Sequence, residues 1–169
     1  MSDTVLAIIE LDNFPQIVAN RAAWIAKLYG SELHLLLSDP SLRFLRDNFI
    51  VSNAAKEVAR EIKVAQKRLL AELEEVAVAS HGITVSSSVV HDRPAHLAII
   101  ERALDIEPRF IVKGTQFRSR AERATFTFTD WQLIRKLNAP LWLVKPNQWQ
   151  KKPVIVAAVD PTNPYDKAA

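Results

Sequence analysis

The stretch "RFIVKGTQFRSRAERATFTFTDW", residues 109 to 131, decides the fold of this chain. Residues 109–113 are a short, largely apolar run of the kind that forms a strand buried on both faces of a parallel sheet. Gly114 and a basic loop follow, and a helical pattern begins at Thr129. A strand, a glycine-containing loop and a helix start in this order have the position and length of a phosphate-binding turn. The function of the chain depends on whether this loop binds a nucleotide.

The rest of the chain repeats the alternation of strands and helices. Apolar runs predict four further strands, at residues 4–10, 32–37, 83–90 and 140–145. Apolar residues at helical spacing predict helices between them, at residues 15–29, 52–80, 94–104 and 129–137. The order βαβαβαβαβ predicts a parallel sheet covered on both faces, with ligands bound beyond the carboxyl ends of its strands.

Local signals predict where the helices end and which faces they bury. Pro15 suits the first turn of a helix, and Gly30 and Gly82 suit the position just after a helix end. We expect Thr129 to cap the last helix, with Gln132 completing a capping box. The side chains that we expect to face the core are Ile17, Val18, Ala22, Trp24, Ile25, Leu28, Ala55, Val58, Ala59, Ile62, Leu69, Leu73, Val76, Ala77, Leu97, Ile100 and Leu104.

The composition is that of a globular protein from a reducing compartment. Of the 169 residues, 49% are hydrophobic, 24% are charged and none is a cysteine. These values predict a cytoplasmic protein without disulfides. No apolar run has the length of a membrane helix, and the N-terminus lacks the basic start of a signal peptide, so we expect no membrane contact. The net charge of +3 is too mild to indicate a nucleic-acid partner.

The end of the chain repeats its beginning. Residues 154–160, "VIVAAVD", match residues 4–10, "TVLAIIE", position by position: small or apolar residues are followed by an acid. The exception is Thr4, which is polar. Either a second copy of the domain begins there, or two buried strands are alike by coincidence. On the first interpretation the chain divides into a domain at residues 1–146 and a linker with the first strand of a second repeat at 147–169. The second repeat of a longer chain is then a natural partner of this domain.

Residues 111–145 resemble the universal stress protein family, and the order of elements does too. That family binds ATP through the motif G-x2-G-x9-G-(S/T) after its fourth strand. In an alignment without gaps, Gly114 is the first glycine of this motif, Phe117 and Thr127 replace the other two, and Phe128 takes the Ser/Thr position. The resemblance is strongest to the tandem-domain E branch of the family, which places two such domains in one chain. It is carried by "HDRP" (91–94), "FTFTDW" (126–131) and "LIRK" (133–136).

The resemblance implies a fold and a set of binding residues. The fold is a five-stranded parallel sheet in the order 3-2-1-4-5 with helices on both faces, which is adenine-nucleotide alpha-hydrolase-like and Rossmann-like. The family places an acid beside the adenine at the end of the first strand, which is Glu10, or Asp12 if the loop is shifted. The third strand ends at Val90 and His91, which border the predicted cleft. His91 either contacts a ligand, caps the following helix or faces solvent.

The phosphate-binding loop departs from the family's pattern. Motif glycines permit positive φ angles and bring backbone N–H groups close to phosphate oxygens, and Phe117 and Thr127 obstruct both. Arg118, Arg120 and Arg123 either bind phosphate in place of the glycines or are solvated loop charges. We therefore expect ATP binding to be weak or absent. The candidate binding residues are Glu10, Asp12, Val90, His91, Gly114, Arg118, Arg123, Thr127 and Thr129.

These observations lead to three hypotheses about function. The first is a non-enzymatic stress-response domain with a degenerate nucleotide site, which acts through dimerisation and ligand sensing. The second is an ATP-binding protein that uses the arginine-rich loop, and the third is a nucleic-acid-binding module. No metal-ligand cluster and no catalytic signature stands out in the sequence. We expect a homodimer through the edge of the fifth strand, "PLWLVK". This strand is apolar, and Lys145 is the one charged residue in it that would oppose pairing with another chain.

Overall fold

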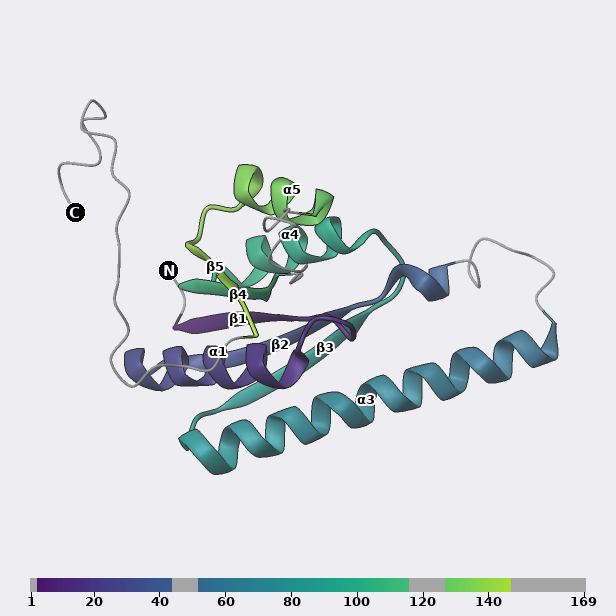
Figure 1. Ribbon diagram of the computed structural model, residues 1–169, viewed down its shortest axis with the longest axis horizontal. Helices are drawn as coiled ribbons and strands as arrows, with labels where there is room; N and C mark the ends of the chain where they lie inside the picture. The colour runs from purple at the N-terminus through teal and green to yellow at the C-terminus, as the bar shows by residue number, and fades with distance from the viewer. Residues whose placement is uncertain (1–2, 44–51, 116–126, 147–169) are drawn as a thin grey trace.

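Five parallel strands form one sheet in the computed structural model, which describes residues 3–43, 52–115 and 127–146 (Figure 1). The strands are β1 (Thr4–Ile9), β2 (Glu32–Ser38), β3 (Val85–Val90), β4 (Phe110–Gly114) and β5 (Leu141–Val144). Their order is β3-β2-β1-β4-β5, and every neighbouring pair is parallel. The expected fold class and strand order are therefore confirmed. The expected second repeat lies outside the described residues.

Helices cover both faces of this sheet. One face is covered by α1 and α3, and the opposite face by α4 and α5 (Figure 1). A short 3-10 turn follows β2. The bounds are α1 (Pro15–Tyr29), the 3-10 turn (Pro40–Arg43), α3 (Asn53–His81), α4 (Ala95–Ile106) and α5 (Phe128–Lys136).

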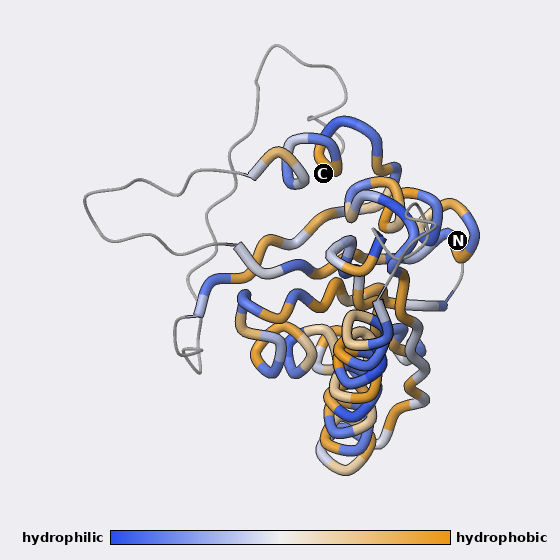
Figure 2. Tube along the Cα trace, turned by 90° about the vertical axis from the view of Figure 1, so that its right-hand side faces the viewer, coloured by the Kyte–Doolittle hydropathy of each residue, from blue (hydrophilic) through white to orange (hydrophobic). Residues whose placement is uncertain are grey.

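Alternate residues of the central strand serve two separate hydrophobic cores. Val5, Ala7 and Ile9 pack in the core beneath α1 and α3, whereas Leu6 and Ile8 pack beneath α4 and α5. Successive side chains of a strand point to opposite faces, so one apolar run fills both cores. Figure 2 shows hydrophobic residues running through the strands and alternating with hydrophilic residues along the helices.

Most helix ends lie where the sequence placed them. Pro15 begins α1, and Gly30 and Gly82 end α1 and α3 in the left-handed conformation. The expected cap of the last helix is wrong by two residues. Thr127, not Thr129, caps α5, because its hydroxyl accepts a hydrogen bond from the backbone N–H of Asp130 and the Asp130 carboxylate accepts one from the backbone N–H of Thr127.

Several expected core residues face solvent instead. Trp24 is 43% exposed and Leu28 is 60% exposed, while the buried face of α1 consists largely of alanines. Small side chains let a helix lie close to a sheet, so alanines take the inner face and larger residues are left outside. The same correction applies to Val58, Val76, Leu97 and Leu104.

The end of β4 passes close to the loop after β1. A Cβ atom added to Gly114 would lie 2.6 Å from the backbone oxygen of Asn13. Asn13 is itself buried, and its side-chain amide donates to Glu10 Oε2 at 2.9 Å. The backbone of Asn13 occupies the space that a side chain at position 114 would need, and this explains why that residue is a glycine.

A buried lysine joins three elements at this end of the sheet. The side chain of Lys113, on β4, is 1% exposed. Its Nζ donates hydrogen bonds to Glu10 Oε2, just after β1, at 2.8 Å and to the Gly114 carbonyl at 3.1 Å. It also forms an ion pair with Asp130 Oδ1 on α5 at 3.0 Å. Because a buried charge is costly unless it is paired, this network holds β1, β4 and α5 in one arrangement.

We predict that Lys113→Met destabilises the protein by about 3–5 kcal/mol, since it leaves the buried carboxylate of Asp130 and the partly buried one of Glu10 without their cation. Urea denaturation followed by circular dichroism measures the loss. The matched control Lys145→Met removes an exposed lysine and should change the free energy of unfolding by under about 0.5 kcal/mol. Adding Asp130→Asn to Lys113→Met should recover part of the loss. A Lys113→Met variant as stable as the parent would show that the network contributes nothing.

We predict that Gly114→Ala destabilises the protein by about 1–3 kcal/mol, because the new methyl group overlaps the Asn13 backbone. Gly82→Asn is the control. That position has a φ of 66° and open space around it, and Asn tolerates the left-handed conformation. The same urea titration should place Gly114→Ala well below Gly82→Asn in stability, and equal stabilities would contradict the close approach.

Candidate functional site

A pocket lies beyond the carboxyl ends of the central strands, where a parallel sheet of this order binds ligands. Its volume is about 410 Å³. The loop after β1 and the turn after β2 form part of its wall, and the first residues of α4 and α5 complete the described part. The lining residues are Glu10, Leu11, Asp12, Ser38, Asp39, Pro40, Ala95, Thr127 and Thr129.

The described wall of this pocket is acidic. Three of its residues, Glu10, Asp12 and Asp39, carry carboxylates, and no lysine, arginine or histidine is among its described lining residues. Burial acts to raise the pKa of Asp39, but hydrogen bonds from Ser41 and Gln66 and the nearby His91 outweigh it, so that this pKa is lowered. Asp39 is therefore a carboxylate at neutral pH.

The hydroxyl of Thr127 is already engaged. It donates to Asp130 Oδ2 at 2.8 Å and accepts from the backbone N–H of Asp130 at 3.2 Å. Asp130 is 1% exposed and also faces Lys113, so the cap is continuous with the buried ion network. A ligand that needs the proton of this hydroxyl would have to break the cap of α5.

The nearest buried cation is unavailable as a phosphate ligand. Lys113 lies behind the pocket wall, and the carboxylates of Glu10 and Asp130 both contact its ammonium group. Glu10 uses the same oxygen, Oε2, to accept from Lys113 and from Asn13. The acid that the family resemblance places beside the adenine is thus part of the structural network here.

The structure brings together four of the nine predicted binding residues. Glu10, Asp12, Thr127 and Thr129 all line the pocket. Gly114 ends β4 immediately after Lys113 and lies against Asn13. The other loop residues with a predicted role, Arg118 and Arg123, lie outside the described residues, as does Arg120.

Val90 and His91 lie apart from this pocket. They border a separate hollow of about 430 Å³ beside α4. Nδ1 of His91 is 3.2 Å from the backbone oxygen of Asp39. Since Asp39 lines the central pocket, His91 links the end of β3 to the turn that shapes the pocket without being one of its lining residues.

Sequence reasoning missed three residues of the site: Asp39, Lys113 and Asp130. A signal existed for two of them. Lys113 is a charged residue at the end of an apolar strand, and Asp130 is the fourth residue of the capping pattern T-x-x-D that begins at Thr127. For Asp39 the one sequence signal was its position just after the second strand, at the end of the sheet where ligands bind.

Metal and membrane signals are absent from the part of the chain that the structure describes. Within it, no three or more His, Cys, Asp or Glu side chains are grouped so that they could hold a metal ion. Within the same residues, no helix combines the length and the apolar character needed to cross a bilayer.

The chain has curated relatives of about twice its length. Universal stress protein E of Escherichia coli (strain K12) is 24% identical over 172 aligned residues, which cover 99% of this chain and 54% of that protein. Universal stress protein E of Photorhabdus laumondii is 24% identical over 160 residues, which cover 94% of this chain and 50% of that protein. The chain therefore spans about half the length of these relatives.

Solved structures share the fold. The universal stress protein from Archaeoglobus fulgidus in complex with dAMP matches with a TM-score of 0.56 and 17% identity over 85% of this chain and 96% of that chain. A universal stress protein in complex with cAMP matches with a TM-score of 0.57 and 16% identity over 85% and 97% of the two chains. The model of the universal stress protein family matches residues 1–145 of the 169, and this chain therefore belongs to that family.

Proposed function

We propose that this chain is a non-enzymatic stress-response domain of the universal stress protein E type, with a degenerate nucleotide pocket. In this proposal it acts through ligand sensing and assembly rather than through turnover. The observation that carries the proposal is the acidic wall of the pocket, where Glu10, Asp12 and Asp39 line the space beyond the strand ends.

An acidic wall opposes a polyphosphate ligand. Two like unit charges about 5 Å apart repel by roughly 3 kcal/mol at an effective dielectric constant near 20. A triphosphate in this pocket would face three carboxylates, while the ammonium of Lys113 is held by Glu10 and Asp130. The hydroxyl of Thr127 donates to Asp130, which removes another donor that a phosphate would use.

The described wall does not equip its serine as a nucleophile, and its Thr127 hydroxyl serves as the cap of α5. Among the described lining residues the one serine is Ser38, and its buried hydroxyl has no hydrogen-bond partner in the described part of the chain. A serine nucleophile needs a base within hydrogen-bond reach, and neither a histidine nor any of the three carboxylates of the described wall accepts a hydrogen bond from Ser38. This supports a binding role over a catalytic one.

A second candidate function is binding of an adenine nucleotide through the arginine-rich loop. Two structures of similar fold are complexes with dAMP and cAMP, which favours an adenine-containing ligand. Arg118, Arg120 and Arg123 would then supply the positive charge that the described wall lacks. A monophosphate suits such a site better than ATP, because it brings less negative charge to the three carboxylates.

We predict that Mg-ATP binds with a dissociation constant above about 1 mM, which is under roughly 4 kcal/mol of binding free energy, because of the carboxylate wall. Isothermal titration calorimetry at low salt measures it, with AMP titrated in parallel. Micromolar binding of ATP would contradict the first function. If the double variant Arg118→Ala/Arg123→Ala then abolished that binding and the control Arg68→Ala did not, the second function would be established.

The edge of β5 supports the proposed assembly. Among the described strands, β5 pairs with β4 on one side and has no strand on the other. Pro140 and Val144 direct their carbonyls to β4, so the backbone of Leu141 and Leu143 points away from it. An unpaired apolar edge of this kind is a template for pairing with a second copy.

We predict that the chain is a dimer at about 50 µM, where a pair with a micromolar dissociation constant is mostly associated. Multi-angle light scattering measures the mass. Leu143→Pro removes an outward-pointing N–H group and should give a monomer, because a proline cannot donate to the partner's strand. The control Leu143→Val keeps that group and should remain a dimer. A parent chain that elutes as a monomer would contradict the assembly proposal.

A further inference from the structure

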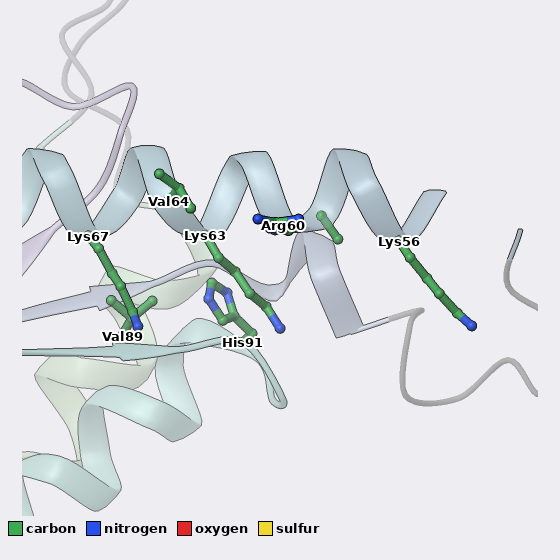
Figure 3. Close-up of a pocket in the computed structure, with 8 residues that line it drawn as sticks. Lys56, Arg60, Lys63, Val64, Lys67, Val89 and His91 are labelled. Carbon is green, nitrogen blue, oxygen red and sulfur yellow. The ribbon is translucent and has the colours of Figure 1, made fainter. Parts of the chain in front are cut away.

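A groove separate from the central pocket lies between α3 and the end of β3. The 29-residue α3 is about 43 Å long, whereas the six-residue β3 spans only about 20 Å. The N-terminal half of α3 therefore extends past the carboxyl ends of the strands (Figure 1). Between it and β3 lies a groove of about 640 Å³, lined by α3 from Lys56 to Lys67 and by Val89 and His91 (Figure 3).

The groove is strongly basic. Lys56, Arg60, Lys63 and Lys67 follow one another at spacings of four, three and four residues, which places them on one side of the helix. All four are exposed, and Lys56, Lys63 and Lys67 form no ion pair within the described residues. Arg60 has one ion pair, with the exposed Glu57 at 3.7 Å. No acidic residue is among the described lining residues of the groove.

We propose that this groove binds an extended acidic peptide that pairs as a strand with the free edge of β3 near Val89 and continues along α3 past the end of that strand. The inference is independent of the proposed nucleotide pocket, because it uses other residues at another edge of the sheet. Three features carry it: the spacing of the cations, the unpaired edge, and the apolar floor.

The cation spacing matches that of an extended chain. Four residues of helix rise about 6 Å, and alternate side chains of a strand lie about 6.6 Å apart. The stripe from Lys56 to Lys67 covers a helix rise of about 16 Å, so an extended segment of about five residues with acids at alternate positions would place three carboxylates along its four cations. The stripe ends at Glu74, seven residues after Lys67 on the same side of α3, which limits the acidic part of the peptide to about five residues.

The edge of β3 is available for strand addition. Among the described strands, β3 pairs with β2 alone, so the other row of its backbone N–H and C=O groups has no strand partner. Peptides bind such edges through main-chain hydrogen bonds, and neighbouring pockets select alternate side chains. Val89, Ala59 and the aliphatic stems of the lysines offer an apolar floor between the charges.

The groove fits a peptide better than a nucleic-acid strand. Proteins that bind single strands place aromatic side chains beneath successive bases. The described lining residues of this groove contain no Phe, Tyr or Trp. A nucleic acid would therefore find phosphate contacts but no stacking partner.

The test uses the whole 169-residue chain and a fluorescent peptide of about nine residues in which glutamate alternates with threonine over the central five. Fluorescence anisotropy at low salt should show saturable binding. The double variant Lys63→Gln/Lys67→Gln should weaken it roughly tenfold, because two exposed ion pairs are lost. Lys27→Gln/Lys136→Gln is the matched control, with the same change of charge at exposed lysines on α1 and α5, and should bind like the parent.

Backbone-methylated peptides distinguish strand addition from simple charge attraction. Methylation of every second amide in one register should abolish binding, whereas methylation in the other register should leave it intact, because only one edge of the peptide faces β3. Equal binding of both methylated peptides would overturn the proposal. So would unchanged affinity in Lys63→Gln/Lys67→Gln, no binding of the unmodified peptide, or tighter binding of a thymidine decamer or inorganic polyphosphate.

Discussion

The buried ammonium group of Lys113 is the interaction on which the carboxyl end of this sheet depends. It cannot remain charged in the interior without partners, and it takes them from Glu10 after β1 and from Asp130 on α5. Those two residues are bound in turn, Glu10 to Asn13 and Asp130 to Thr127. The loop after β1, the end of β4 and the start of α5 are therefore one polar unit, and displacing any part of it leaves a buried charge uncompensated.

This unit changes the chemistry of the crevice that the fold provides. The pocket stands where the strand order reverses, as in other parallel sheets. Two of the described groups in or beside it that could bind phosphate are used internally, since Lys113 is neutralised and the Thr127 hydroxyl caps a helix. The described side chains that face the open space are mainly carboxylates and threonines. The family fold is kept and the described part of the pocket wall is acidic, which is why we propose sensing or assembly in place of ATP binding.

The two edges of the sheet offer different chemistry. At β5 the edge is apolar, and Trp142 packs against the core beneath α1 and α3. At β3 the carboxyl end of the edge, near Val89, adjoins the basic stripe of α3, which runs from Lys67 back to Lys56. An apolar edge favours a second copy of the chain, whereas a basic edge favours an acidic strand. Both surfaces follow from an open sheet, because a sheet that does not close must leave two strands with one unpaired side.

The sequence by itself determined the order of strands and helices and most helix ends, because hydrophobic periodicity and residues such as Pro15 and Gly82 act locally. The resemblance to a family added the strand order. Only the tertiary structure decided which side of a helix is buried, as Trp24 shows, and which residues form the polar unit. Glu10 and Lys113 are 103 residues apart in the chain, and no local pattern encodes that pairing. It arises because β1 and β4 lie side by side in the sheet, which brings their carboxyl ends together.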